Sequence, residues 1–345
     1  RGIDHLKVDE FSRVNVFLGQ NNSGKSTVLE AIHMLAGMSN PEMPQNLNRI
    51  RTKNFYANFS DVFYLFHNMD VKNTPEFIAE QFDGNERKLR LNMTYSFDEK
   101  EMMSQSNPMH GGLPVSETKV YLNTLEMNFE TNEQGVVKRR QSSITVKPDG
   151  MLSDKKIAEG YLEKYQTVYL TTEMWGINLP AALSALFKRK QKDVVLSRLH
   201  LFDNRVADID ILQDDVYVDF DNMPEKLPLR MVGDGMRRYL HMVAASATPM
   251  NNVLLIDEID NGLHYTVQKQ LWSIIFKLAI KLNVQIFATT HSTDCISSFS
   301  YVLKEEDNVE EGRYIRLENK QGVITYTEYN LDELKIVAAQ NIEIR

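Results

Sequence analysis

A glycine-rich stretch near the start of the chain combines residue types that bind phosphate groups. Residues 19–27 are Gly-Gln-Asn-Asn-Ser-Gly-Lys-Ser-Thr, which matches the pattern G-x-x-x-x-G-K-[ST]. Phosphates are anionic and bind where backbone N–H groups converge at a helix N-terminus, and Gly19 and Gly24 allow the tight curl and close approach that this requires. The pattern predicts that Lys25 contacts the β- and γ-phosphates of a nucleotide and that the Ser26 hydroxyl ligates Mg²⁺.

The flanking sequence supplies the elements that position such a loop. Val14–Leu18 is an apolar run typical of a buried strand, and residues 28–35 have the composition of a helix. The alternative is a Gly/Asn/Ser turn that happens to precede a helix, and it would have to reproduce both the motif and its context by chance. The residues expected to contact the nucleotide are Gly19, Asn21, Asn22, Ser23, Gly24, Lys25, Ser26 and Thr27.

A second apolar run ends in two carboxylates. Residues 253–258 are Val-Leu-Leu-Ile-Asp-Glu, the pattern of a buried strand with acidic residues at its carboxyl end. Beside a phosphate loop, the first carboxylate can hold Mg²⁺ directly or through water, and the second can accept a proton from an attacking water. We therefore assign Asp257 to Mg²⁺ and Glu258 to general base, against the alternative of an acidic strand end at the surface.

A third apolar run, residues 284–288, is followed by a polar cluster that contains His291. The spacing from Asp257 leaves room for one crossover helix and a return to the sheet. Parallel strands of such sheets end at a shared edge, where ligands bind. We expect His291 to contact the γ-phosphate or to orient the attacking water, although a lone histidine is more often a structural group.

Residues Gly233, Asp234 and Gly235 precede and open a segment expected to be helical to about residue 247. Glycines ahead of a helix make a second anion-binding N-terminus, which raises the question of whose phosphate it contacts. The simpler alternative is a helix cap preceded by a flexible turn.

Composition narrows the class of protein. The chain has 345 residues, of which 42% are hydrophobic, and 39 basic against 47 acidic residues give a net charge of −8. This balance does not favour nucleic-acid binding, although a local basic face is compatible with it. The single cysteine, Cys295, fits a reducing cytosol, and no apolar run is long enough to span a membrane. We expect a cytoplasmic protein without a signal peptide. Because the chain opens without an initiator methionine, a first strand could lie before Arg1.

The two ends of the chain predict one α/β core. Residues 231–300 follow the order loop, helix, strand, helix, strand, which is typical of a parallel sheet with crossover helices. Residues 167–170 are expected to add a core strand, residues 180–202 to be helical, and residues 315–326 to form a closing hairpin. This core is expected to comprise residues 1–37 and 165–345.

Residues 38–164 have a different character and predict an inserted lobe. After a polar loop or short helices, apolar and polar residues alternate in residues 89–97, 125–130 and 143–146. Alternation of this kind indicates antiparallel strands in a half-exposed sheet.

Four motifs carry a resemblance to a known family. Residues 19–27, 233–238, 257–264 and 289–292 occur in the order and approximate spacing of ABC-type ATPases. Within that class the chain resembles stand-alone prokaryotic ATPases of the OLD, RecF and SMC-like group, with phrases such as Gly-Asp-Gly-Met-Arg-Arg and Leu-Ile-Asp-Glu-Ile-Asp-Asn-Gly-Leu-His. The resemblance implies a P-loop NTPase with an ABC-ATPase-like mixed sheet, ATP and Mg²⁺ as ligands, and the antiparallel lobe as a variable insertion.

The resemblance also implies a head-to-tail homodimer with two ATP molecules buried between the subunits. The phosphate loop of one subunit would then face Gly233–Gly235 of the other, which answers whose phosphate the second anion site contacts. Residues 261–264 would link the two sites. Whether dimers assemble into higher oligomers is left open.

Several departures from the family pattern bear on function. His264 stands where transporter ATPases usually have aspartate, and the sequence around Gly233 differs from the Leu-Ser-Gly-Gly-Gln of transporters, which argues against a transporter subunit. The glutamine that normally senses Mg²⁺ is not assigned, with Gln81 and Gln166 as candidates. Neither long coiled coils nor a TOPRIM nuclease domain is present, so the chain resembles a sensor whose effector is a separate protein.

These observations favour an ATPase switch that controls a separate effector, a TOPRIM-like nuclease or a toxin, in prokaryotic antiviral defence. The alternative is a DNA-repair or DNA-clamping ATPase of the RecF/SMC type, with the basic runs 188–192 and 138–140 as nucleic-acid contacts. A third hypothesis, a scaffold that holds ATP without hydrolysing it, is disfavoured by the intact Asp257–Glu258 pair.

Overall fold

The computed structural model describes residues 2–52, 59–81, 83–97, 121–146, 152–171, 178–247, 252–305, 309–330 and 333. The chain divides into two compact units, each described by itself. One comprises residues 5–29 and 164–345, and the other comprises residues 1–4 and 30–163. The functional boundaries predicted at residues 37 and 165 stay a prediction.

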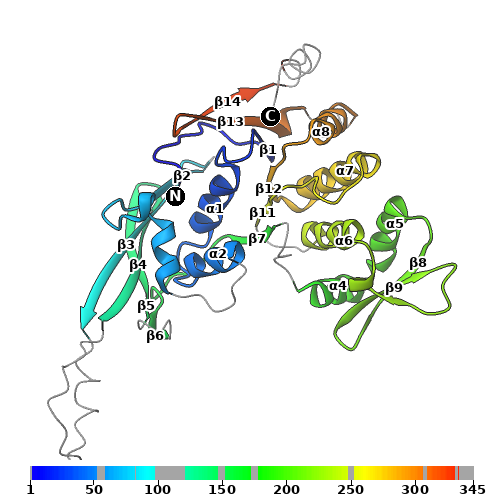
Figure 1. The fold of residues 1–345 in the computed structure, drawn as a ribbon, viewed down its shortest axis with the longest axis horizontal. Coiled ribbons are helices and arrows are strands. Elements are labelled where there is room, and N and C mark those ends of the chain that lie inside the picture. Colours follow the sequence, from blue (N-terminus) through cyan, green and yellow to red (C-terminus); the bar gives the residue numbers. More distant parts are fainter. Residues whose placement is uncertain are drawn as a thin grey trace, which may run out of the picture. The chain divides into compact units, whose positions relative to one another are not determined.

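A six-stranded mixed sheet forms the centre of the first unit (Figure 1). Its order is β14-β13-β1-β12-β11-β7. The strands are β1 (Val14–Leu18), β7 (Gln166–Leu170), β11 (Asn252–Ile256), β12 (Gln285–Thr289), β13 (Gly312–Lys320) and β14 (Val323–Tyr329). All neighbours pair in parallel except β13 and β14, which form the antiparallel hairpin that the sequence predicts. The α/β fold of a P-loop NTPase is thereby confirmed.

The central strands are mostly apolar because both faces of the sheet are covered. All five residues of β1 are buried, and β12 is buried from its second residue onward. The crossover helices α6 (Asp234–Ala247), α7 (Tyr265–Leu282) and α8 (Thr293–Glu305) line one side of these strands in Figure 1. Large side chains such as Trp272 and Phe299, whose ring centroids lie 4.5 Å apart, fill the core between them.

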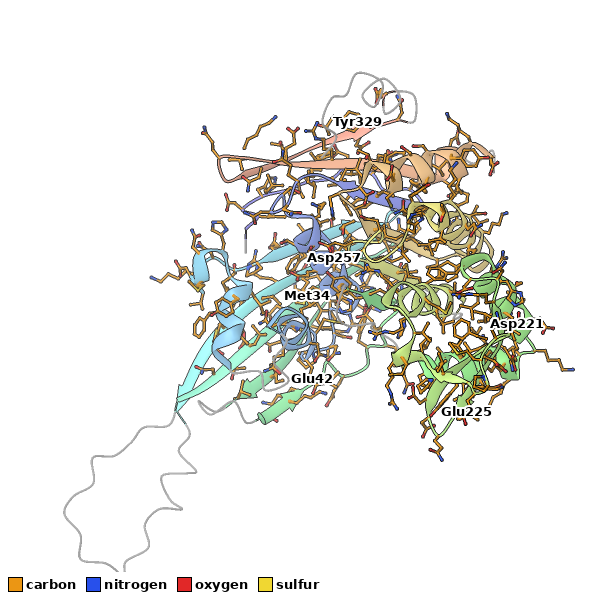
Figure 2. The ribbon with its side chains drawn as sticks, turned by 45° about the vertical axis from the view of Figure 1, so that its right-hand side comes forward. Met34, Glu42, Asp221, Glu225, Asp257 and Tyr329 are labelled. Carbon is orange, nitrogen blue, oxygen red and sulfur yellow. The ribbon has the colours of Figure 1, made fainter. Side chains whose placement is uncertain are left out.

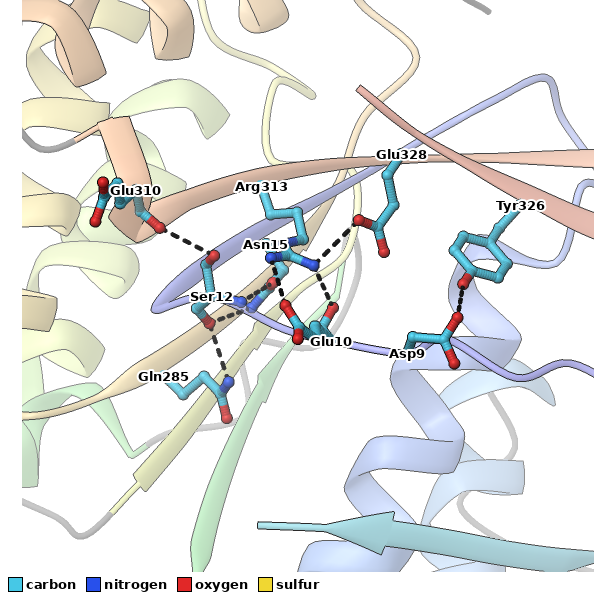
Figure 3. A network of polar contacts seen from close by, with 9 residues as sticks. All are labelled: Asp9, Glu10, Ser12, Asn15, Gln285, Glu310, Arg313, Tyr326 and Glu328. Carbon is cyan, nitrogen blue, oxygen red and sulfur yellow. Dashed lines mark hydrogen bonds and ion pairs between the residues drawn. The ribbon is translucent and has the colours of Figure 1, made fainter. Parts of the chain in front are cut away.

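The segment ahead of β1 is fastened to the sheet by polar contacts (Figure 3). The Asn15 amide donates to the carbonyl oxygens of Ser12 at 2.8 Å and Ile286 at 3.2 Å. Arg313 on β13 donates to the carboxylates of Glu10 and Glu328, each at 3.1 Å. These contacts fix the start of β1, and the phosphate loop follows directly from its other end.

Residues 178–228 contain more structure than the sequence predicts. The single helical region expected at 180–202 is two helices, α4 (Leu179–Lys188) and α5 (Lys192–Phe202), because the chain turns through a left-handed Lys190 with φ +59°. A small sheet that we did not predict follows them, with strands β8 (Val206–Leu212), β9 (Asp215–Phe220) and β10 (Leu227–Pro228).

The other unit is built on an antiparallel sheet of order β2-β3-β4-β5-β6. Its strands are β2 (Glu76–Glu80), β3 (Glu86–Phe97), β4 (Tyr121–Glu133), β5 (Val136–Val146) and β6 (Leu152–Lys156), and the helix α2 (Met43–Thr52) precedes them. The expected alternation is confirmed, since Leu89, Leu91, Leu125, Met127 and Ile144 are at most 2% exposed while their neighbours are not.

Within the described ranges, no helix has both the length and the apolar character needed to cross a membrane.

Candidate functional site

The predicted phosphate loop lies between β1 and the helix α1 (Lys25–Ala36), as its motif requires. Gly19 and Gly24 have φ of +137° and +93°, in the region that favours glycine. A Cβ on Gly19 would also collide with the carbonyl oxygen of Leu317 on β13. Both glycines of the motif are therefore needed by the backbone itself, before any ligand is considered.

The remaining loop residues differ in exposure. Asn21 and Asn22 are exposed, and Thr27 and Ser26 are partly buried. Ser23 is 2% exposed, and among the described residues its Oγ has no hydrogen-bond partner. A buried hydroxyl without a partner inside a phosphate-binding motif is consistent with a ligand contact. Contact of these residues with a nucleotide stays a prediction.

Lys25 is folded onto its own loop. Its Nζ donates to the carbonyl oxygens of Gly19 at 2.6 Å and Gln20 at 2.7 Å, and the residue is 9% exposed. Burial lowers the pKa of Lys25, while the charges of Asp257, Glu258 and Asp260 act in the opposite direction. The Lys25 ammonium group, which the motif predicts to contact phosphate, is thus hydrogen-bonded to carbonyl oxygens of its own loop.

The two predicted magnesium ligands lie side by side. Ser26 Oγ donates to Asp257 Oδ1 at 3.1 Å, and Thr289 Oγ1 donates to the same oxygen at 2.6 Å. Oxygen ligands from a hydroxyl and a carboxylate next to a phosphate loop suit Mg²⁺, which usually retains waters and phosphate oxygens as its other ligands. The arrangement therefore fits the ion, with Ser26 and Asp257 as the protein groups that would hold it. Asp257 is labelled in Figure 2.

Glu258 follows Asp257 with a left-handed backbone, φ +49°. This region costs roughly 1–2 kcal/mol for a residue with a Cβ, so neighbouring groups must hold it. The Glu258 N–H donates to Thr289 Oγ1 at 2.8 Å, its carbonyl accepts from the Asn261 N–H at 2.9 Å, and its carboxylate accepts from Asn261 Nδ2 at 3.2 Å. The carboxylate is partly exposed, which leaves it accessible to water.

The second glycine motif begins α6, as expected. Gly235 packs closely against the turn after β11, since a Cβ there would lie 2.6 Å from the Gly262 carbonyl oxygen. Gly233 is exposed and a Cβ there would meet nothing within 4 Å. Asp234 begins the helix, and its side chain lies outside the described part of the structure. The two glycines therefore have different surroundings within the chain.

His291 lies after β12 with an exposed side chain. In the described residues it shows neither a hydrogen bond nor an ion pair, so its predicted role is neither supported nor contradicted by a contact. His264 is also exposed and precedes α7, with its Nδ1 3.0 Å from Thr266 Oγ1. Of the two glutamines left open, Gln81 lies in the other compact unit, and the side chain of Gln166 lies outside the description.

Two residues of the site were not singled out from the sequence. Thr289 is fully buried and contacts both acidic residues, and Arg238 on α6 is 4% exposed and donates to the carbonyl oxygens of Asp257, at 2.6 Å, and Glu258. Thr289 ends β12, so its place at a strand terminus was a usable signal. Arg238 lies three positions after Gly235, on the same helical face.

The basic runs of the alternative hypothesis are partly neutralised within the chain. Lys192 forms ion pairs of 2.9 Å with Asp208 and Asp210 of the small sheet, and Arg139 pairs with Glu130 at 2.9 Å. Residues 188–190 are exposed and remain as a basic turn between α4 and α5.

Comparison with known proteins agrees with the chemistry of these groups. A family described as "AAA ATPase domain" matches residues 1–172, and one described as "AAA domain, putative AbiEii toxin, Type IV TA system" matches residues 149–296. A Helicobacter pylori (strain ATCC 700392 / 26695) protein named "ATP/GTP phosphatase" is 24% identical over 359 residues, covering 95% of this chain and 93% of that protein.

Solved structures of SMC head domains show low similarity. A head bound to the C-winged helix domain of ScpA has a TM-score of 0.42 and 14% identity, covering 94% of this chain and 93% of that one. The head domain from Thermotoga maritima has a TM-score of 0.37 and 11% identity, covering 92% and 90%.

Proposed function

We propose that this chain, a P-loop ATPase, is a nucleotide-driven switch that controls a separate effector protein. The observation that carries the proposal is the cluster in which Asp257 accepts from both Ser26 and Thr289, with Glu258 directly beside it. A cluster of this kind places the groups for holding Mg²⁺ and for activating water next to the loop that binds phosphates.

Binding would begin with a change of partner at Lys25. Its Nζ would leave the carbonyl oxygens of Gly19 and Gln20 and turn to the β- and γ-phosphates, where a cation stabilises developing charge. Bound Mg²⁺ would supply Lewis-acid stabilisation of the phosphates, and Ser26 and Asp257 would hold it. Glu258 would accept a proton from the water that attacks the γ-phosphate, and His291 would orient that water.

ATP would also close a head-to-tail homodimer. The exposed Gly233 and the N-terminus of α6 would contact the γ-phosphate held by the partner's loop, because backbone N–H groups at a helix start favour an anion. Hydrolysis removes this anion, so the dimer would reopen. The lobe formed by residues 38–164 would signal to the effector protein whether the dimer is open or closed.

The effector is proposed to be a TOPRIM-like nuclease or a toxin that acts in prokaryotic antiviral defence, in the cytoplasm. The description of the family that matches residues 149–296 names a toxin and a type IV TA system, which supports a role of this kind. The free, buried Cys295 suits a reducing compartment.

A DNA-repair or DNA-clamping ATPase is the second candidate, because residues 188–190 form an exposed basic turn. Contacts from this turn to DNA phosphates would make binding fall steeply with salt. Charge reversal of Lys188, Arg189 and Lys190 should then reduce the salt dependence, whereas an unchanged slope would remove this candidate.

Two variants test the ATPase mechanism. Lys25→Ala should weaken ATP binding by about tenfold or more, through loss of a charge-assisted contact. Glu258→Gln should bind ATP normally but lower kcat by a factor of roughly 10² to 10⁴, the usual contribution of a general base. Unchanged nucleotide affinity in the first variant, or unchanged turnover in the second, would remove the role assigned to that residue.

Native mass spectrometry of Glu258→Gln, purified from its own host with ATP and Mg²⁺, tests the switch. A trapped dimer that carries a second polypeptide would support effector control and identify the effector. A trapped dimer that carries nucleic acid would favour the clamping alternative, and a monomer with ATP bound would contradict the dimer.

A further inference from the structure

One arginine joins α6 to the backbone that bears the proposed general base. Arg238 is 4% exposed, although an arginine is seldom buried without partners. Its Nη2 donates to the carbonyl oxygens of the two consecutive acidic residues, Asp257 at 2.6 Å and Glu258 at a shorter separation. In both of these contacts the guanidinium binds a main-chain oxygen of the turn that follows β11.

The main chain that Arg238 contacts is the part of the site that needs support. Glu258 has φ +49°, a conformation that is uncommon for a residue other than glycine. Three sets of contacts hold it: Thr289 Oγ1 accepts from its N–H, Asn261 contacts its carbonyl and carboxylate, and Arg238 contacts its carbonyl. Of these three residues, only Arg238 lies on a helix, α6, whereas Asn261 belongs to the same turn as Glu258 and Thr289 ends β12.

The same face of α6 makes a second contact with this turn. Gly235 lies three positions before Arg238, so both residues are on one side of the helix. Gly235 approaches Gly262 so closely that a Cβ would lie 2.6 Å from the Gly262 carbonyl oxygen. The first turn of α6 thus rests on both ends of residues 257–262.

The electrostatic surroundings keep the guanidinium in place. Burial lowers the pKa of Arg238, and the charges of Asp260, Glu258 and Asp257 act in the opposite direction. Asp260 is itself held by Thr290 Oγ1 at 2.5 Å. The hydrogen bonds from Arg238 are therefore charge-assisted, and such bonds are roughly twice as strong as neutral ones.

We propose that Arg238 is a positioning residue that holds Glu258 in its left-handed conformation and makes α6 and the general base move as one body. Arg238 does not touch the reacting atoms and acts only through Glu258. This inference rests on the proposed role of Glu258, and it adds a path within one subunit from the helix that begins near Gly233 to the water-activating carboxylate.

The test is a double-mutant cycle in steady-state ATP hydrolysis. Arg238→Met keeps the length and apolar stem of the side chain but removes its donors. It should lower kcat by roughly 10- to 100-fold, because small displacements of a catalytic group cost about this much. KM and ATP affinity should change by less than about threefold. In a Glu258→Gln background the same substitution should lower the residual rate by less than about twofold, since the group that it positions is already absent.

Arg87 provides a matched control. It is 5% exposed, and its Nη2 also donates to two consecutive carbonyl oxygens, those of Leu35 at 3.1 Å and Ala36 at 3.2 Å, in the other compact unit. The same Nη2 pairs with Glu163 at 2.5 Å. Arg87→Met should lower the melting temperature but leave kcat of the folded protein within about twofold. Arg238→Lys keeps a charged donor and should recover part of the rate that Arg238→Met loses. If Arg238→Met does not fold, Arg238→Lys takes its place in the cycle.

The outcomes separate this inference from the proposed function. An equal loss of rate from Arg238→Met with either Glu258 or Gln at position 258 would overturn the positioning role while leaving the general base intact. A parallel loss of kcat in Arg87→Met would also overturn it, by showing a general effect of losing a buried arginine. A Glu258→Gln variant with undiminished turnover would instead contradict the proposed function.

Discussion

Thr289 and Asp257 are joined by a 2.6 Å hydrogen bond from the threonine hydroxyl to the carboxylate oxygen that also accepts from Ser26. Thr289 is fully buried, and its hydroxyl also accepts from the Glu258 N–H at 2.8 Å. One side chain therefore orients both the carboxylate that we propose to hold Mg²⁺ and the backbone of the proposed general base. We predict that Thr289→Val, which keeps the shape of the side chain, lowers stability by about 1–3 kcal/mol because polar groups lose their partner.

The same variant should raise the Mg²⁺ concentration needed for half-maximal hydrolysis by about tenfold or more, since groups that orient a metal ligand affect affinity on this scale. Urea denaturation and a magnesium titration of the ATPase rate measure the two effects. Thr289→Ser retains the hydroxyl and should stay close to wild type. Equal behaviour of the valine and serine variants would show that the hydroxyl has no such role.

We predict different effects of an added side chain at the two glycines near the start of α6. Gly235→Ala should destabilise the subunit itself, by roughly 1–3 kcal/mol, because its Cβ would lie 2.6 Å from the Gly262 carbonyl oxygen. Gly233→Ala should be nearly neutral in thermal melts, since a Cβ there meets nothing within 4 Å.

Gly233→Glu consequently tests dimer closure better than an acidic substitution at Gly235, because a side chain at position 233 should not destabilise the fold. It would place an anion where the partner's γ-phosphate is expected, so ATP-dependent dimerisation of a Glu258→Gln background should be lost with little change in melting temperature. Sedimentation velocity with ATP and Mg²⁺ measures this, with Gly233→Gln as the uncharged control. A dimer that persists with glutamate at position 233 would contradict the head-to-tail arrangement.

His291 is predicted to act on the chemical step rather than on binding. Its side chain is exposed at the end of β12, so replacing it should leave the fold intact. His291→Ala should lower kcat by about tenfold or more and leave ATP affinity within a few-fold, as expected for a group that orients water or contacts the γ-phosphate in the transition state. A titration with a fluorescent ATP analogue measures ATP affinity, and a steady-state assay measures kcat. An unchanged kcat would show that His291 has no role in hydrolysis.

The predictable part of the molecule is the part where local chemistry dictates structure. The phosphate loop was predictable because Gly19 and Gly24 adopt backbone angles that favour glycine. The strands β1, β11 and β12 were predictable because parallel strands covered on both faces are mostly apolar. The lobe strands were predictable from alternation, since one face of their sheet is buried.

The contacts of Thr289 and Arg238 were harder to predict because they depend on tertiary packing. Arg237 and Arg238 are neighbours of identical type, and only the position of α6 against the turn after β11 decides that Arg238 is the buried one. The small sheet β8–β10 was missed for a related reason. Its aspartates resemble a polar loop, yet Asp208 and Asp210 are paired with Lys192.

His33 predicts a specific acid sensitivity of the fold. Burial lowers its pKa from an ordinary value of 6.5 to about 4, so the folded protein keeps the imidazole neutral where the unfolded chain protonates it. The unfolded state then binds more protons between these two values, and stability must fall as the pH falls from about 6.5 towards 4. The contribution is on the order of 3 kcal/mol, because each pKa unit corresponds to 1.36 kcal/mol.

Replacing His33 with glutamine should flatten this part of the stability profile. Urea denaturation at pH 7.0, 5.5 and 4.5 (roughly the window between the two pKa values) measures the difference between variant and wild type, in which contributions from other carboxylates and histidines cancel. His5→Gln, at an exposed side chain, is the matched control and should keep the wild-type slope. If His33→Gln loses stability between pH 6.5 and 4 as steeply as wild type, the imidazole is not held neutral by burial, and the acid sensitivity arises elsewhere in the chain.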